Sequence, residues 1–416
     1  MAKSDTEVAI IGGGAAGIAA GRRLAKAAIE CLVIEARPRL GGRAWTVADD
    51  AGNTLDLGCG WLHSAEQNPW TTIAQAQGRT IDRSLPPWQK PALTAGFSAA
   101  EQADFGKALR AFFERLEAIG LRSGDAPASQ AFDPDCRWNG LIDAVGTYIT
   151  GTEMDRVSAV DFANYADTAT NWRVREGYGT TIAAHGEGLP VLLDCPVLRI
   201  DHSGRRLKIE TAKGTITADQ VIVTLPSAVL ADKEFLFAPA LPDKTVAAAG
   251  LPLGLADKLF LSLSQAEEFP PDSRLFARTD RAATAAYNLR HMGQPLVEVY
   301  FGGRFAKELE GSGDDAFADY AISELAGLLG NDFRRRVKPV RIHRWGADPF
   351  ALGSYSYAKP GYAGCRATLA APVDGRLFFA GEACSENEFS TAHGGYLTGV
   401  AAADQVITAR QDRRKR

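Results

Sequence analysis

The stretch "EVAIIGGGAAGIAAGRRLAKA" limits the folds open to this chain more than any other. Residues 7–11 form a short apolar run that stops at glycines, which is typical of a buried strand. Gly12, Gly14 and Gly17 follow in GxGxxG spacing, and a stretch of helical composition comes next. Glycines at this spacing allow a tight turn, a close backbone approach to a pyrophosphate, and close packing of helix on strand.

A second apolar run, "CLVIEA" (31–36), ends in Glu35, at the distance expected for a carboxylate that binds a ribose hydroxyl. The two strands and the helix predict a βαβ unit with a right-handed crossover. The first turn of the helix offers N–H groups and partial positive charge to phosphates. The alternative is a glycine-rich turn in an unrelated α/β fold. The predicted dinucleotide contacts here are Gly12, Gly14, Ala15, Ala16, Gly17, Glu35, Ala36 and Arg37.

A basic turn follows in "ARPRLGGRAWT" (36–46), which contains Gly42 and Arg43. An arginine just beyond the acidic strand end can reach a pyrophosphate and bind it through two N–H groups. The alternative is an arginine solvated at the surface.

Composition excludes several classes of protein. The 416-residue chain has a net charge of −4, which argues against nucleic acid or an anionic membrane as the main partner. Its six cysteines form no CxxC pair and no zinc-ligand spacing, so we expect a reducing compartment and no metal. We see no signal peptide and no apolar run of membrane-spanning length, so we expect a soluble, cytoplasmic protein.

The rest of the chain is mixed. Residues 98–123 and 312–330 are predicted to be helical, the former with a capping box in "SAAE". Strand-like runs occupy 197–226, 257–264 and 295–303, and a last helix starts near Gly395. Nucleotide-type segments at both ends with an insert between them indicate two interleaved domains.

The run GxGxxG…E…GGR resembles the flavin-containing amine oxidase family, which includes monoamine and polyamine oxidases. The likeness recurs in "LDLGCGWLHSAEQNP" (55–69), in the strands of 197–226 and in "LPLGLADKLFLSL" (251–263). It recurs again in "RWGADPFALGSYSYAKPG" (344–361) and "FFAGEACSENEFSTAHGGYLTG" (378–399). About residues 85–180 resemble the family only weakly, and substrate choice usually depends on that part.

The resemblance implies an α/β fold with a Rossmann-type FAD-binding domain, formed by 1–84, 190–232 and 345–416. A substrate domain of mixed sheet and helices, 85–189 and 233–344, is interleaved with it. The resemblance adds to the FAD contacts Gly42, Arg43, Gly60, Trp61, Val197, Trp345, Gly381, Glu382, Gly395, Tyr396 and Leu397. Some relatives tether FAD through a cysteine at the position of Ser354. Serine cannot form that thioether, so we expect non-covalent FAD.

The resemblance also implies the catalytic residues. Tyr355 and Tyr396 match the two walls of an aromatic cage, although period-2 alternation alone would make Tyr355 an ordinary strand residue. Lys258 would lie near flavin N5, holding a water, and in a desolvated and even neutral form it could relay protons or promote the reaction with oxygen; the alternative is an edge-strand lysine in solvent. His63 would lie near the substrate, or be a satisfied core histidine.

The implied reaction is transfer of a hydride from a primary or secondary amine to the flavin, giving an imine that hydrolyses to an aldehyde or ketone. O2, giving H2O2, or a redox protein would then take the electrons. The rivals are an L-amino-acid oxidase, which needs an arginine near the cage, another FAD-dependent oxidoreductase of the superfamily, and a flavoprotein without turnover. The particular amine, the acceptor and a homodimeric state stay open.

Overall fold

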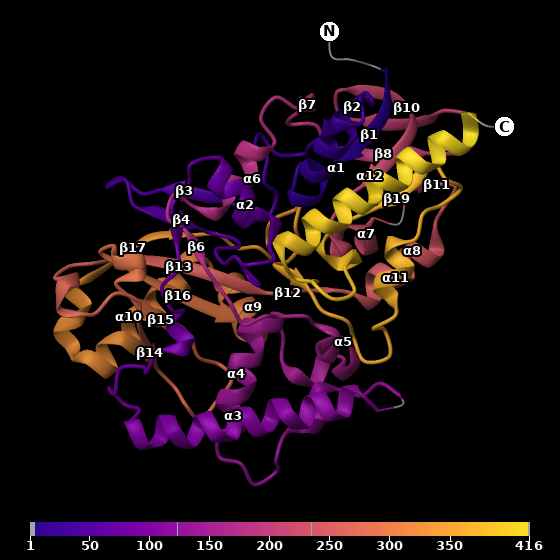
Figure 1. Ribbon diagram of the computed structural model, residues 1–416. Helices are drawn as coiled ribbons and strands as arrows, with labels where there is room; N and C mark the ends of the chain where they lie inside the picture. Colours follow the sequence, from indigo (N-terminus) through magenta and orange to yellow (C-terminus); the bar gives the residue numbers. More distant parts are fainter. Residues whose placement is uncertain (1–4, 123, 234, 415–416) are drawn as a thin grey trace.

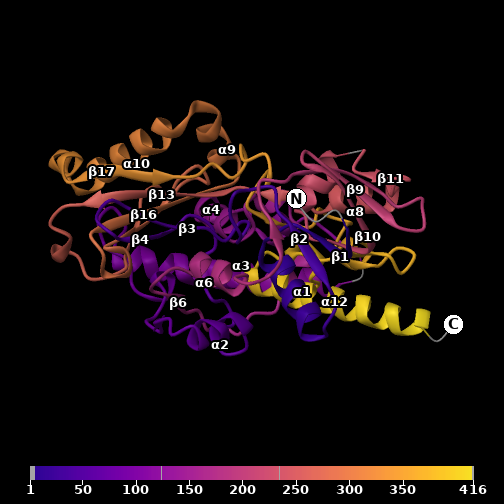
Figure 2. The same ribbon diagram turned by 90° about the horizontal axis from the view of Figure 1, so that it is seen from above.

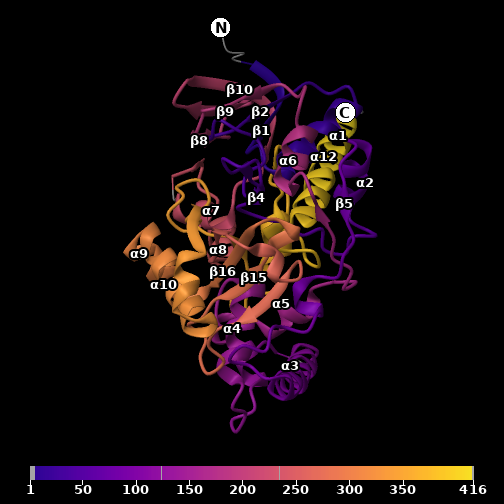
Figure 3. The same cartoon turned by 90° about the vertical axis from the view of Figure 1, so that its left-hand side faces the viewer.

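The computed structural model describes residues 5–122, 124–233 and 235–414. The molecule is elongated, with a nucleotide-binding half at one end and a second half, built on its own sheet, at the other (Figure 1). Both ends of the described chain lie in the nucleotide-binding half, and α3 (Ala99–Gly120) lies at the opposite end (Figure 3). The chain passes between the halves repeatedly, as interleaved domains require.

The nucleotide-binding half is built on a sheet of eight described strands in the order β11-β8-β9-β10-β1-β2-β7, with β19 also paired to β10. β10 is long, so one of its edges pairs with β9 near its start and with β19 near its end. The strands are β1 (Asp5–Ile11), β2 (Cys31–Ile34), β7 (Val191–Leu192), β8 (Val197–Asp201), β9 (Leu207–Thr211), β10 (Gly214–Val223), β11 (Phe237–Ala238) and β19 (Leu377–Phe379).

Helices cover this sheet on both faces, which is why its central strands read as unbroken apolar runs. The C-terminal helix α12 lies along α1 (Figure 1). Their close approach needs Gly399, since a Cβ there would come within 2.2 Å of the backbone oxygen of Ala16. The helices of this half are α1 (Ala15–Lys26), α2 (Pro69–Ala76), α6 (Tyr178–His185), α7 (Ser227–Asp232), α8 (Pro242–Gly250), α11 (Cys365–Ala370) and α12 (Ala392–Arg414).

The second half contains an antiparallel sheet in the order β14-β15-β16-β13-β17. One face packs its apolar side chains against α9 and α10, and the other face turns toward the nucleotide-binding half and α4 (Figure 2). Its elements are β13 (Ala256–Leu263), β14 (Ser273–Phe276), β15 (Ala286–Leu289), β16 (Leu296–Gly302), β17 (Val337–Ile342), α9 (Gly303–Ser312) and α10 (Asp314–Leu329).

A helical layer completes this half. α3 begins at the predicted capping box: Ser98 accepts from the N–H of Glu101, and the Glu101 carboxylate accepts from the N–H of Ser98. Its apolar stripe packs against α4 (Asn139–Thr150) and α5 (Ala159–Asn164). Short pairs join the segments: β3 (Thr46–Ala48) with β4 (Thr54–Asp56), β5 (Ile81–Asp82) with β6 (Arg173–Val174), and β12 (Leu253–Gly254) with β18 (Tyr355–Ser356). The 3-10 helices are η1 (Pro87–Gln89), η2 (Ala128–Ala131), η3 (Met154–Arg156), η4 (Ala266–Glu268), η5 (His291–Gly293), η6 (Asn331–Arg335) and η7 (Glu382–Cys384).

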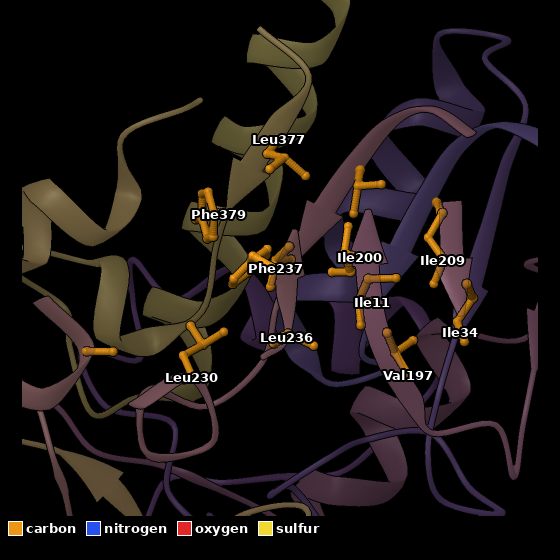
Figure 4. Close-up of a cluster of buried hydrophobic side chains, with 14 of the residues drawn as sticks. Ile11, Ile34, Val197, Ile200, Ile209, Leu230, Leu236, Phe237, Leu377 and Phe379 are labelled. Carbon is orange, nitrogen blue, oxygen red and sulfur yellow. The ribbon is translucent and has the colours of Figure 1, made fainter. Parts of the chain in front are cut away.

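The sequence-based expectation of an α/β fold with two interleaved domains is confirmed, but two stretches lie on a different side from the one predicted: β11 with the following α8, and α6. β11 pairs with β8, and Phe237 packs with Ile200 and Phe379 in the nucleotide-binding core, beyond the boundary predicted at residue 232 (Figure 4). α6 packs against α1 and α2, although 85–189 were expected in the substrate domain. Neither short segment carries a local signal for its distant partner.

Candidate active site

One elongated cavity runs from the first βα turn to the face of the β13–β16 sheet. It encloses about 1630 Å³ of space, counting the part open to solvent. Nearly all of the predicted site residues line it: Gly12, Gly14, Ala15, Ala16, Glu35, Ala36, Arg37, Gly42, Arg43, Gly60, Trp61, His63, Val197, Lys258, Trp345, Tyr355, Gly381, Glu382 and Gly395. The structure thus brings together segments that are more than 380 positions apart, such as Gly12 and Gly395.

The glycine turn forms the nucleotide end of the cavity. Gly12 has a φ of +106°, and a Cβ at Gly17 would lie 1.9 Å from the backbone oxygen of Gly12. Gly17 therefore does not line the cavity but lets α1 pack closely on the turn. The buried Glu35 carboxylate accepts from the N–H of Gly13 at 2.6 Å and of Arg37 at 2.8 Å. It keeps acceptor capacity for a ribose hydroxyl, because a carboxylate has about four acceptor positions.

Arg43 lies in the middle of the cavity. Its Nη1 donates to the Glu382 carboxylate at 2.9 Å and to the backbone oxygen of Ser354 at 2.8 Å. Burial by itself would raise the pKa of Glu382, but Arg43, the Ser356 hydroxyl and Arg366 lower it by more. The Glu382 carboxyl is therefore ionised and holds the guanidinium at the cavity wall, which argues against the alternative of a freely solvated arginine.

Lys258 lies on β13, between β16 and β17, so the alternative of an edge-strand lysine in solvent is wrong. Its side chain is 6% exposed, and its Nζ donates to the backbone oxygen of Asp56 at 3.1 Å. Glu298 lies 3.5 Å from Nζ. Burial by itself would lower the pKa of Lys258, but Glu298 raises it by more, so the expectation of a neutral lysine is not met.

Tyr355 is part of the cavity wall, and its hydroxyl donates to the backbone oxygen of Tyr148 at 2.7 Å. Burial raises the pKa of Tyr355 well above its usual value, so the phenol stays neutral. Tyr300, also at the cavity, has its hydroxyl 3.4 Å from that of Tyr355. The period-2 alternation expected around Tyr355 does not continue, since β18 has only two residues and Tyr357 is buried in the core between α3 and α4.

Tyr396 and Leu397 are not among the described residues that line the cavity, contrary to the sequence-based expectation. The Tyr396 ring packs on Trp70, with centroids 5.1 Å apart, and Leu397 is 42% exposed. The reason is helix geometry: Gly395 faces the cavity, and each further residue turns by about 100° around α12. Thr391, the residue before α12, lines the cavity.

His63 lines the cavity, and its Nδ1 lies 2.6 Å from Oδ1 of Asn171. The Asn171 amide nitrogen donates to the backbone oxygen of Ala169, so Oδ1 is an acceptor and Nδ1 carries the proton. Burial lowers the pKa of His63 in spite of Asn171, so the ring is neutral and its Nε2 retains a lone pair.

The cavity also contains residues that sequence reasoning missed, among them Cys59, Thr224, Tyr300, Phe350, Ser390 and Thr391. All of these except Tyr300 lie inside the stretches that carry the family resemblance, so the signal was present but was not assigned to them. Tyr300 is different: only the pairing of β16 with β13, which sets it opposite Lys258, reveals it.

The residues present fit FAD. The turn glycines leave room for a pyrophosphate, the first turn of α1 points its N–H groups there, and Glu35 is placed for the ribose. The lining also includes the aromatic side chains of Trp61, Tyr300 and Tyr355, which can contact a flavin ring. Among the described residues, no group of three or more His, Cys, Asp or Glu side chains could hold a metal ion. None of the described helices combines the length and apolarity needed to cross a bilayer.

A dinucleotide cavity that ends against a buried lysine and two phenols defines the class of an FAD-dependent oxidoreductase. A family model described as "flavin containing amine oxidoreductase" matches residues 15–119 and 122–407. The chain is 30% identical to polyamine oxidase 4 of Oryza sativa subsp. japonica over 97% of its length and 88% of that protein. It is equally similar to polyamine oxidase 2 of Arabidopsis thaliana, with the same coverage.

Among solved structures, a double mutant of putrescine oxidase matches with a TM-score of 0.76. That match covers 98% of this chain and 100% of the other at 19% identity, so it shows the fold alone. The chain belongs to the flavin-containing amine oxidoreductase family. It is an enzyme that oxidises amines, and its cofactor is FAD.

Proposed function

We propose that this enzyme oxidises a primary or secondary amine to an imine, which water then hydrolyses to an aldehyde or ketone. When bound, FAD would supply the electron sink for a hydride from the carbon next to the amine nitrogen, with O2 as the final acceptor that yields H2O2. The observation that carries the proposal is the meeting of Lys258, Tyr300 and Tyr355 at the end of the FAD cavity.

The side chains at that end bind and orient the substrate. Neutral phenols and the Trp61 ring form a water-poor wall, which favours an amine over an ammonium ion because low-dielectric surroundings disfavour charge. The free Nε2 of His63 can accept a hydrogen bond from the amine. Ser354 lines the cavity and supports non-covalent FAD.

The main rival, an L-amino-acid oxidase, needs a cation for the substrate carboxylate. The arginines among the described lining residues are Arg37 and Arg43, and both lie in the FAD part of the cavity. Arg37 is paired with Asp348 at 2.7 Å and Arg43 with Glu382. This arrangement favours an amine without a carboxylate next to the reacting carbon. Because two relatives are named polyamine oxidases, diamines and polyamines come first among the candidates.

The test is anaerobic titration of the FAD-loaded protein with a panel of diamines, polyamines, monoamines and L-amino acids while the flavin spectrum is recorded. Bleaching of the oxidised flavin by amines, followed by release of H2O2 when O2 is admitted, is the expected result. Bleaching by L-amino acids alone would support the rival. No bleaching by any compound would indicate a flavoprotein without turnover on these substrates.

A further inference from the structure

A buried carboxylate lies directly behind Lys258. Side chains alternate along a strand, so Lys258 and Phe260 of β13 share one face of the sheet with Glu298 and Tyr300 of β16. The register sets Lys258 opposite Tyr300 and Phe260 opposite Glu298, so Glu298 is the diagonal neighbour of Lys258. The Lys258 and Glu298 side chains are 6% and 5% exposed, and both strands are interior to the sheet.

Glu298 has partners on both of its oxygens. Oε1 lies 3.5 Å from Nζ of Lys258, and Oε2 lies 3.4 Å from Nδ1 of His291. The side-chain amide of Asn288 also donates to Oε2 at 2.9 Å. Nζ of Lys258 is held on another side by the backbone oxygen of Asp56. The ammonium is therefore fixed between Glu298 on β16 and the end of β4.

The energetic balance depends on Glu298. Burying an unpaired ammonium costs several kcal/mol, so a lone lysine here would lose its proton. Burial alone would raise the pKa of Glu298 and lower that of Lys258, yet each is shifted the other way. For Glu298 the opposing groups are His291 and Lys258, and for Lys258 the largest is Glu298.

Other charged or titratable groups face the pair from the surrounding elements. Tyr300 of β16, Asp56 of β4 and Cys59 after β4 act on Lys258, which in turn acts on His63. Arg173 of β6 also has a coulombic interaction with Glu298. Among the described carboxylates, Glu298 alone forms an ion pair with Nζ within 4.0 Å. Removing its charge is therefore the sharpest way to change the state of Lys258.

We propose that Glu298 is a positioning residue that anchors the Lys258 ammonium at the cavity wall and keeps it charged during turnover. The inference rests on the proposed function in one respect, that Lys258 faces the flavin. A lysine that stays charged supplies a fixed positive field beside the flavin ring and does not accept a proton from the amine. The substrate ammonium must then lose its proton to solvent before it reacts, because the lowered pKa of His63 makes that ring a poor proton acceptor.

The test reads the charge of Lys258 directly. In FAD-loaded protein labelled with ¹³C at lysine Cε, the Lys258 resonance is assigned by its loss in Lys258→Met. In the wild type, the ¹³Cε chemical shift of Lys258 should remain that of a charged amine from pH 6 to 10. In Glu298→Gln the titration midpoint of Lys258 should move to a lower pH, at a proton concentration at least tenfold higher than in the wild type. Glu298→Asp, which keeps the charge, should fall less, and Asn288→Ala, a matched neutral deletion, should stay close to wild type.

An unchanged Lys258 titration in Glu298→Gln overturns the inference, as does an equal shift in Asn288→Ala. Should Glu298→Gln not fold, Glu298→Ala, which leaves room for water, is measured in its place under the same criterion. The titration does not require turnover. A shifted titration in a protein that oxidises no amine would support the inference while defeating the proposed function, so the two failures are distinguishable.

Discussion

Arg43 and Glu382 are 339 positions apart in sequence, and their side chains meet at 2.9 Å in the middle of the FAD cavity. Arg43 follows the acidic end of β2, and Glu382 begins η7 after β19. The pair ties the first and last thirds of the chain together at the cofactor. Charge-assisted hydrogen bonds are roughly twice as strong as neutral ones, so the contact fixes the guanidinium as well as neutralising it.

Glu382→Gln should weaken FAD binding. The amide keeps the shape but loses the charge that holds Arg43 and the acceptor shared by Ser356 and Ser390. A loss of about 1.5 kcal/mol, at the low end for a charged hydrogen bond, corresponds to roughly a tenfold rise in Kd for FAD. Equilibrium titration of apoprotein with FAD measures it. An unchanged Kd would show that Arg43 does not depend on Glu382.

Tyr355→Ala should reduce amine turnover far more than Tyr396→Ala does. Tyr355 lines the cavity, whereas the Tyr396 ring packs on Trp70 outside it. We expect at least a tenfold drop in kcat/KM for Tyr355→Ala. For Tyr396→Ala we expect a loss of stability of about 3 kcal/mol or less, with kcat/KM within a few-fold of wild type. The opposite order would reinstate Tyr396 as the second wall of the site.

Lys258→Met should slow a half-reaction of the flavin while FAD stays bound. Methionine fills similar space without the charge, so the cavity keeps its shape but loses its positive field. Stopped-flow absorbance, with reduction by amine and reoxidation by O2 followed separately, should show at least one rate lowered tenfold or more. If both rates in Lys258→Met equal those of the wild type, Lys258 has no role in the chemistry.

Acid precipitation of the purified yellow protein should release all of its FAD into the supernatant. Ser354 occupies the position at which a thioether would form in the family, and its Oγ is hydrogen-bonded to the backbone of Ala256. Absorbance of the supernatant and mass spectrometry of the polypeptide provide the measurement. Flavin retained on the chain would point to another attachment site, such as Cys59, which also lines the cavity.

Stability of the FAD-loaded protein should fall as the pH is lowered from 7. The pKa values of Glu298 and Glu382 are lower in the folded protein than their ordinary value of 4.5. Their contribution is complete above that value and is lost as the pH falls through it. The pKa of His63 is also lowered, so the unfolded chain binds its proton first, below about pH 6.5. Thermal melts with excess FAD should show Tm declining below pH 6.5 and more steeply below 4.5, and a Tm that rises on acidification would contradict this.

The sequence by itself determined the first βα turn, the amphipathic α3 with its capping box, and the family. These depend on local rules: glycines set backbone angles and close approaches, and side chains cap a helix three residues away. The tertiary structure decided which side of α12 faces the cavity, with Gly395 at the wall and the Tyr396 ring on Trp70. It also placed β11 beside β8 and Glu298 behind Lys258. Those relationships depend on strand register and helix rotation, because contacts between distant segments are set by the packing of the whole core and leave no short-range signal in the chain.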